Sequence, residues 1–173
     1  MPLPDAETVY AELEAKLKRG LDYHAHLIGI HSGGAWIAQR LARVLLGEHP
    51  VGFLDVSFYR DDYEQRGLKQ KVRRSEIPFD VAGKRILLVD DVLYTGRSVR
   101  AALNELFDYG RPASVELAVL VDRGGRELPI EAQYVGARLA VAQDQSVALT
   151  RDAEGRFGLT LEAAPEEGGT ANA

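Results

Sequence analysis

Apolar residues near the start of the chain recur at helical spacing. Val9, Leu13 and Leu17 lie on one face of a helix with the usual period of 3.6 residues. Asp5 stands before this run and Gly20 directly after it, and these residue types are favoured at the two ends of helices. The pattern predicts an amphipathic helix that packs its apolar face against the rest of the fold.

Short unbroken apolar runs alternate with helical patterns through the following hundred or so residues. Such runs are typical of strands that are buried on both faces of a parallel sheet. The predicted strands are residues 26–30, 51–59, 86–89 and 115–121. Helical spacing follows the first strand from Ile37 to Leu45 and the third from Val99 to Leu106. This alternation predicts an α/β fold with right-handed crossovers and a mostly parallel, doubly wound sheet.

The pattern changes after Asp122, where helical spacing disappears. Short strand-like pieces follow at residues 134–139, 146–149 and 156–161. We expect a single domain at residues 1–162, in which residues of about 122–150 form a small hood. Residues 163–173 combine acids, glycines and alanines without an apolar face, which predicts a disordered tail.

Residues 60–76 are polar and show no apolar periodicity, so we expect a mobile loop. Part of this loop carries five cations and no acid, namely Arg66, Lys69, Lys71, Arg73 and Arg74. A solvated loop face and a contact with an anionic ligand both agree with such a run.

Composition narrows the possible classes of function. The 173 residues include no cysteine, which excludes disulfides, thiolate zinc sites and a cysteine nucleophile. No stretch approaches the roughly 20 apolar residues of a membrane helix, and the amino terminus lacks a basic segment followed by an apolar one. The net charge of -5 gives no overall attraction to nucleic acid. We therefore expect a cytoplasmic protein with no membrane contact, in which any RNA binding needs a local basic patch.

Two acids and an anion-binding turn follow the third predicted strand. Asp90 and Asp91 end the apolar run, at the place where parallel sheets gather ligands. The turn at residues 94–98 then supplies hydroxyls, a glycine and a helix start whose N–H groups favour a phosphate. Carboxylates repel a bare phosphate, so they are useful beside one only when they bind sugar hydroxyls or a divalent cation. A phosphorylated ribose with magnesium (Mg2+) satisfies both halves of this pattern.

Two other interpretations of these residues remain open. In the first, Asp90 caps a helix and Asp91 is a solvated loop residue without a ligand. In the second, the acids belong to a phosphorylation-dependent receiver domain, which also ends strands in acids. The receiver hypothesis leaves the anion-binding character of residues 95–98 unexplained, and a small phosphodonor that modified neither aspartate would dismiss it.

Residues 86–100, with the sequence ILLVDDVLYTGRSVR, resemble the signature that type I phosphoribosyltransferases use for 5-phosphoribosyl-1-pyrophosphate (PRPP). More narrowly, the chain is similar to the PyrR family of pyrimidine operon regulators that are also uracil phosphoribosyltransferases. The similarity extends from about residue 28 to 136 and includes residues 55–62, 109–112 and 117–130. It implies a type I phosphoribosyltransferase-like parallel sheet flanked by helices, with a small hood.

The resemblance also implies roles for individual residues. Asp90 and Asp91 are the expected catalytic and metal-binding residues, which hold the ribose hydroxyls and magnesium. The expected residues for PRPP or nucleotide are Ser32, Gly33 and Gly34 in a pyrophosphate loop, together with Val92, Leu93, Tyr94, Thr95, Gly96, Arg97 and Ser98. The expected flap residues are Tyr59, Arg60 and Arg73, and the expected hood residues are Gln133, Tyr134 and Val135.

Two residues depart from the pattern of the family. Gly33 stands where the family usually has an arginine, and Gln133 stands where relatives place an aspartate in position to contact metal or base. A neutral amide is a poor ligand for magnesium, so these departures favour weaker pyrophosphate binding and slower turnover.

The resemblance implies an enzyme that forms UMP and pyrophosphate from uracil and PRPP, with a flap that excludes water. It also implies a homodimer or higher homo-oligomer that binds leader RNA. The segment of residues 137–146, which belongs to the RNA surface of relatives, has only one basic residue here, so few phosphate contacts are expected. The alternative is a regulatory protein that senses PRPP or a nucleotide with little catalysis.

Overall fold

The computed structural model describes residues 2–22, 24–45, 47, 49–57 and 75–164. Its helices are α1 (Ala6–Gly20), α2 (Gly33–Leu45) and α4 (Arg97–Asp108). Its strands are β1 (His26–Ile30), β2 (Gly52–Leu54), β3 (Arg85–Leu93), β4 (Ser114–Asp122), β5 (Tyr134–Arg138), β6 (Gln145–Arg151) and β7 (Phe157–Ala163). Among the described residues, no helix has the length and apolar character needed to cross a membrane.

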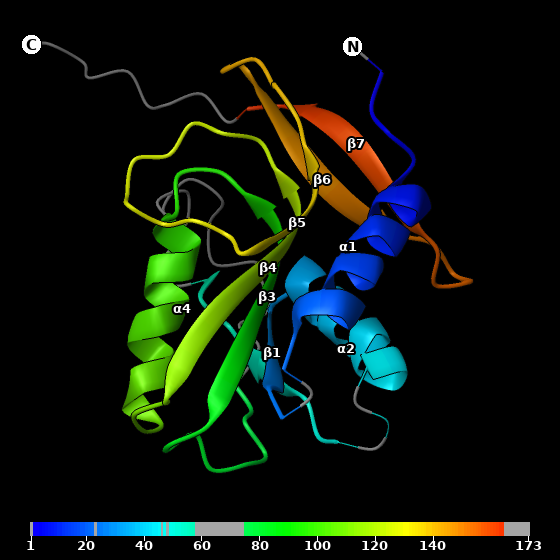
Figure 1. Ribbon diagram of the computed structural model, residues 1–173. Helices are drawn as coiled ribbons and strands as arrows, with labels where there is room; N and C mark the ends of the chain where they lie inside the picture. The colour runs from blue at the N-terminus through cyan, green and yellow to red at the C-terminus, as the bar shows by residue number, and fades with distance from the viewer. Residues whose placement is uncertain (1, 23, 46, 48, 58–74, 165–173) are drawn as a thin grey trace, which may run out of the picture.

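Five of these strands form one parallel sheet in the order β2-β1-β3-β4-β5. Helix α4 covers one face of the sheet, while α1 and α2 cover the other (Figure 1). Strands β6 and β7 pair antiparallel in a separate hairpin. The predicted α/β fold with a parallel sheet flanked by helices is therefore confirmed.

The unbroken apolar run of β3 has a direct explanation in this layering. Ile86 and Leu88 point into the core beneath α4, whereas Leu87 and Val89 point into the core beneath α1 and α2. Successive side chains of a strand alternate between faces, so a strand covered on both sides needs apolar residues at every position. This central strand delivers its carboxyl end to the edge of the sheet where the acids lie.

The predicted first helix is confirmed, and Asp5 caps it. The Asp5 carboxylate accepts a hydrogen bond from the backbone N–H of Thr8 at 2.9 Å. Gly20 is the last helical residue rather than the residue after the helix. The buried face of α1 includes Leu13 and Leu17, as their spacing predicts.

Three segments differ from the prediction. Strand β2 covers only Gly52–Leu54, because Asp55 then turns the chain by accepting a hydrogen bond from the N–H of Ser57. Strand β5 is the fifth strand of the main sheet instead of part of a hood, because its backbone pairs with β4. Strand β7 continues to Ala163, one residue into the predicted tail, while residues 165–173 lie outside the described residues.

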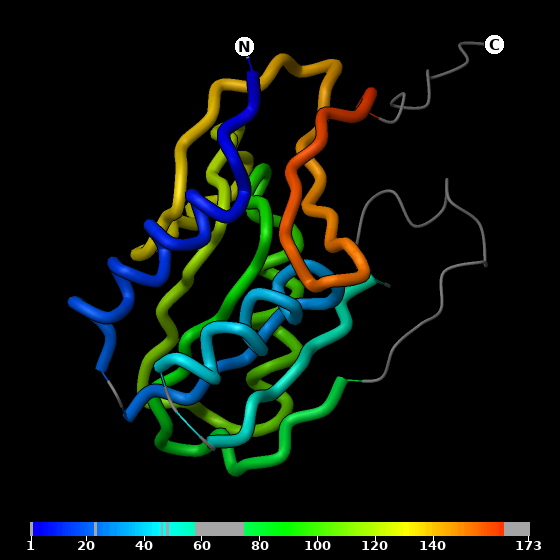
Figure 2. The backbone as a smooth tube through the Cα atoms, turned by 90° about the vertical axis from the view of Figure 1, so that its right-hand side faces the viewer, coloured from blue at the N-terminus to red at the C-terminus, as the bar shows by residue number. Residues whose placement is uncertain are grey.

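The hairpin is fixed to the helices by one charged cluster. The Arg40 guanidinium donates two hydrogen bonds to the Glu7 carboxylate, at 2.9 and 2.7 Å. Glu7 also accepts a hydrogen bond from the N–H of Phe157 at 2.7 Å, and Arg40 lies over the Tyr10 and Phe157 rings. The cluster therefore joins α1, α2 and β7, which lie side by side in Figure 2.

Candidate functional site

The predicted acids lie in the last part of β3, on the edge where the parallel strands end. Asp90 is buried and Asp91 is partly exposed. Each carboxylate is oriented by the backbone, since Asp90 accepts from the N–H of Asp91 at 3.0 Å and Asp91 accepts from the N–H of Val92 at 2.9 Å. These short local bonds fix the direction of both carboxylates before any ligand arrives.

The start of α2 comes directly against these acids. A Cβ atom added to Gly33 would lie 2.3 Å from Oδ2 of Asp91, and one added to Gly34 would lie 2.3 Å from the carbonyl oxygen of Val89. No side chain fits at either position without a shift of its neighbour. The two glycines therefore let the positive end of a helix approach Asp91, and Gly33 has a packing reason as well as a possible ligand role.

The turn after β3 has the geometry of an anion site. Gly96 is left-handed, with φ of +93°, and α4 begins at the next residue. The Thr95 hydroxyl accepts a hydrogen bond from the N–H of Arg97 at 3.2 Å. The remaining N–H groups of the first helical turn lack carbonyl partners within the helix, as at every helix start. Residues Tyr94 to Ser98, which directly follow β3 and its acids, thus form a turn that suits an anion such as a phosphate, and we name it the phosphate turn.

The segment after β4 also reaches this edge, although the sequence analysis assigned no site residue to it. Asp122 is buried, and both its carboxylate oxygens accept hydrogen bonds from Arg126 Nη2 at 2.8 Å. Burial alone raises the pKa of Asp122, but the hydrogen bonds from Arg126 and from the N–H of Gly124 outweigh it and lower the pKa. The sequence did contain a pattern that could have indicated this segment as part of the site, because residues 122–127 read DRGGRE directly after a predicted buried strand.

The structure does not bring the three expected hood residues to the strand ends. Gln133 precedes β5, and its amide oxygen accepts a hydrogen bond from the N–H of Leu117 at 2.7 Å, in the middle of β4. Tyr134 donates to Glu116, and the carbonyl of Val135 accepts from Lys16 Nζ at 2.7 Å. The expectation that these residues face the ligand is therefore not supported, because Gln133 precedes the edge strand β5 and Tyr134 and Val135 begin it.

The expected flap residues Tyr59, Arg60 and Arg73 lie outside the described residues, as does the rest of the basic run. The two ends that flank this segment are held together. Ser75 Oγ accepts a hydrogen bond from the N–H of Asp55 at 3.0 Å and donates one to Glu105 of α4. Glu76 pairs with Phe53 through two backbone hydrogen bonds.

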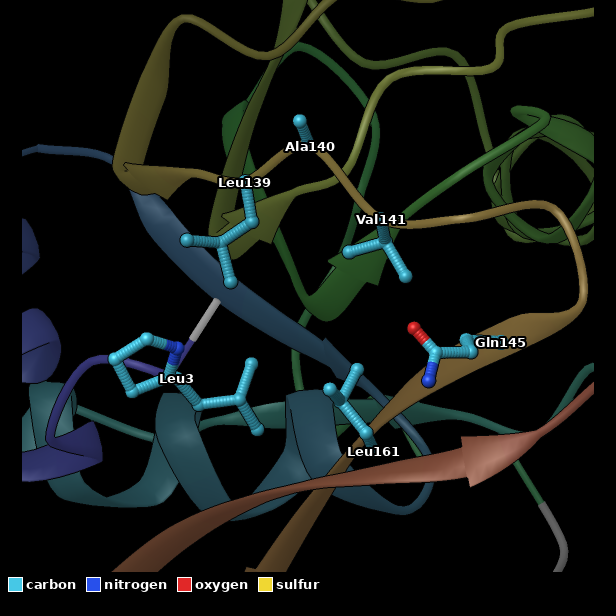
Figure 3. Close-up of a pocket in the computed structure, with 7 residues that line it drawn as sticks. Leu3, Leu139, Ala140, Val141, Gln145 and Leu161 are labelled. Atoms are coloured by element: carbon cyan, nitrogen blue, oxygen red, sulfur yellow. The ribbon is translucent and has the colours of Figure 1, made fainter.

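Two cavities lie near the ends of β4 and β5. The first is a small cavity of about 50 Å³ between Leu3, the chain at residues 139–141, Gln145 and Leu161 (Figure 3). It contains none of the predicted site residues and is too small for a sugar phosphate. The second is an open cleft of about 560 Å³, lined by Asp122, Arg126, Leu128, Pro129, Ile130, Glu131 and Arg138. Ile130 also lies against Gly96, so the larger cleft adjoins the phosphate turn.

Comparison with known proteins gives concordant similarities. The phosphoribosyl transferase domain family matches residues 4–148. The bifunctional protein PyrR of Ralstonia nicotianae is 52% identical over 167 residues, which cover 91% of this chain and 94% of that protein. A hypoxanthine-guanine phosphoribosyltransferase of Bacillus anthracis has the same fold, with a TM-score of 0.62 and 18% identity over 81% of this chain and 84% of that one. A purine phosphoribosyltransferase of Pyrococcus horikoshii gives a TM-score of 0.58 and 27% identity over 77% and 81% of the two chains.

Proposed function

The chain belongs to the phosphoribosyl transferase family and, within it, to the PyrR proteins, and on this premise we propose that it joins uracil to PRPP to form UMP and pyrophosphate. The resemblance predicted from the sequence is confirmed, and with it the assignment as a phosphoribosyltransferase. The observation that carries the proposed reaction is the meeting of three features at one edge of the sheet. These are the acids Asp90 and Asp91, the glycine start of α2, and the turn of residues 94–98.

Each feature matches one part of PRPP. The N–H groups at the start of α4 suit the 5-phosphate, because a helix start favours a dianion. Asp90 and Asp91 are hydrogen-bond acceptors that suit the ribose hydroxyls. Gly33 lies against Asp91 and Gly34 against Val89 and Asp90, and the loop that they form with Ser32 suits the pyrophosphate. In the reaction, the base nitrogen forms a bond to C1 of the ribose as the C1–oxygen bond to pyrophosphate breaks, and the base loses its proton. No nucleophile from the protein is needed, so the residues act by orientation and by electrostatic stabilisation.

The residues present fit a magnesium ion that arrives with its substrate. Among the described residues, no group of three or more His, Asp or Glu side chains forms a cation site on its own. Magnesium usually binds through one or two carboxylates, with water and substrate phosphates as the other ligands. Asp90 and Asp91 would supply those two carboxylates, and the bound ion would neutralise charge on the departing pyrophosphate.

The alternative of a sensor with little catalysis rested on Gly33 and Gln133. Gly33 packs against Asp91, where a side chain would displace the carboxylate. Gln133 hydrogen-bonds to β4, so its amide does not take the place of a metal-binding carboxylate at the strand ends. The departures at residues 33 and 133 therefore both have structural reasons, and neither removes an acid from the carboxyl ends of the strands. This favours the enzyme over the sensor.

Steady-state assays with uracil, PRPP and magnesium test the proposal. We expect turnover in the wild type and its loss in Asp90→Asn, because the amide replaces a charged acceptor by a group that also donates. Asp108→Asn, at the exposed end of α4, is the matched control and should keep the wild-type rate. Binding of PRPP without turnover in the wild type would favour the sensor instead. Hypoxanthine as a competing base tests the preference for a pyrimidine.

We also propose that the chain regulates pyrimidine genes through leader RNA, as the second activity of a bifunctional protein. Within residues 137–146 only Arg138 is basic, and Lys16 of α1 is already bound to the carbonyl of Val135. We therefore expect a shallow dependence of RNA affinity on salt. A slope of zero in a plot of log K against log salt would contradict RNA binding through phosphates. The cytoplasmic location and the assembly into a homodimer or higher oligomer stay predictions.

A further inference from the structure

The turn of residues 94–98 is held at consecutive positions by one other segment of the chain. This segment is residues 122–130, which begin at the last residue of β4, and we name it the brace. Arg126 Nη1 donates to the carbonyl oxygen of Tyr94 at 2.8 Å. The N–H groups of Glu127 and Leu128 both donate to the carbonyl oxygen of Thr95, at 3.0 and 3.1 Å. A turn whose carbonyls are fixed in this way presents its N–H groups in one direction only.

The next two residues of the turn are also in contact with the brace. Ile130 lies against Gly96, where an added Cβ atom would come within 3.0 Å of the Ile130 side chain. Glu127 accepts a hydrogen bond from Arg97 Nε at 2.8 Å. Contact therefore runs without interruption from Tyr94 to Arg97, although more than twenty residues separate the two segments in sequence.

Arg126 is the centre of the brace because its donors reach three separate acceptors. Its Nη2 donates to both carboxylate oxygens of the buried Asp122. Its Nε donates to the carbonyl of Ile130 at 2.9 Å, and its Nη1 donates to the carbonyl of Tyr94. The planar guanidinium holds these donors in a fixed relation, which a lysine cannot reproduce. Asp122 thus orients Arg126 by charge, and Arg126 in turn connects the end of β4 to the first residue of the turn.

Arg123 holds the same turn from a second side. Its guanidinium lies 3.8 Å from the centre of the Tyr94 ring, while Nη1 and Nη2 donate to the carbonyls of Gln145 and Ala142. Arg123 is itself buried. Tyr94 is therefore fixed through both its ring and its carbonyl by two arginines of the brace.

We propose that Asp122 and Arg126 are positioning residues that fix the phosphate turn in its binding geometry. This inference rests on the proposed function, since it takes the 5-phosphate of PRPP as the ligand of the turn. The two residues need not touch the substrate. Their effect passes through the carbonyl of Tyr94 and the alignment of the N–H groups that follow it, where an error of about 1 Å can cost about 10²-fold in rate.

The test compares Arg126→Lys and Arg126→Gln with the wild type and with Arg85→Lys. Arg85 is the matched control, because it also donates to an aspartate, Asp22, at 2.6 Å but lies exposed at the opposite end of β3. Three quantities are measured: the amide hydrogen exchange of peptides that span Tyr94 to Ser98 without ligand, the dissociation constant of PRPP with magnesium, and the KM for uracil. Arg126→Lys keeps a cation beside Asp122, so the inference can still be tested with this variant if Arg126→Gln fails to fold.

We expect faster exchange in the turn and a PRPP affinity weakened by about 10- to 100-fold in Arg126→Lys, with little change in KM for uracil. Arg85→Lys should match the wild type in all three. A general loss of structure would instead reduce the active fraction and leave the KM for PRPP unchanged. Unchanged exchange, or faster exchange with wild-type PRPP affinity, overturns the inference. Failure of the wild type to bind PRPP would overturn the proposed function, whereas the exchange result would still decide whether Arg126 fixes the turn.

Discussion

Gly34 is the position at which one added methyl group should do the most damage to the proposed active site. A Cβ atom there would lie 2.3 Å from the carbonyl oxygen of Val89 and 2.9 Å from Cα of Asp90. Both neighbours are backbone atoms of the central strand, so neither can rotate away. Ordinary contact begins at 3.4 Å, and Gly34→Ala therefore requires α2 and β3 to separate by about 1 Å.

The displacement has two measurable consequences. Overpacking of this kind costs about 1–3 kcal/mol of stability, which urea denaturation followed by circular dichroism can measure. A shift of about 1 Å between the pyrophosphate loop and Asp90 should lower kcat/KM for PRPP by about 10²-fold. Gly33→Ala is the informative comparison, since its Cβ comes closest to the Asp91 carboxylate, at 2.3 Å, which can rotate away and leave only the contact with Cβ of Asp91 at 2.8 Å. It should lose activity with a smaller loss of stability.

Gly20→Ala is the control for Gly34→Ala. The nearest neighbour of its added methyl group is the Tyr134 side chain, at 3.1 Å, and Gly20 lies far along the chain from the acids. We expect stability and kcat/KM close to the wild type. If Gly34→Ala showed wild-type stability and wild-type kinetics, the close approach of α2 to β3 would be wrong, and with it the explanation of the paired glycines.

Three further changes test the fold and the chemistry. Glu7→Gln should cost about 1–2 kcal/mol, because it weakens the hydrogen bonds from Arg40 and Phe157. Those bonds from Arg40 hold the pKa of Glu7 below its ordinary value. The stabilisation is therefore complete above the pKa of Glu7 in the unfolded chain and is lost as the pH falls through its pKa in the folded protein. A difference in stability between variant and wild type that persisted at pH 2 would contradict this. Leu88→Ala should cost about 2–5 kcal/mol in urea denaturation, because the side chain is fully buried, while Leu161→Ala, which is 40% exposed, should cost far less. Chelation with EDTA should stop turnover and added magnesium should restore it, and undiminished turnover in EDTA would exclude the proposed role of the ion.

Local patterns in the sequence were sufficient to predict most of the helices and strands. Val9, Leu13 and Leu17 predict a helix because one period of 3.6 residues brings them to one face, and they are buried together in α1. The run before Asp90 predicts a buried strand because both its faces require apolar residues. The acids and the turn of residues 94–98 are contiguous in sequence, so their association needs only one strand and the start of one helix.

Strand β5 shows where this reasoning stops. Its short, half-buried pattern agrees equally well with a hood strand and with the edge of a sheet. Only the pairing of Ala118 with Tyr134 and of Val119 with Val135 assigns it to the main sheet. That pairing also places Gln133 beside Leu117, in the middle of β4 and away from the strand ends.

The sequence by itself determined that a buried strand carries two acids near its end and leads into a glycine-containing turn, because these features follow one another along the chain. The tertiary structure alone decided what surrounds them. The approach of Gly34 to Val89, and the contacts of Arg126 with Asp122 and Tyr94, join residues that are far apart in sequence. No periodicity encodes such contacts, since they depend on how the strands order themselves in the sheet and on how closely the backbones pack.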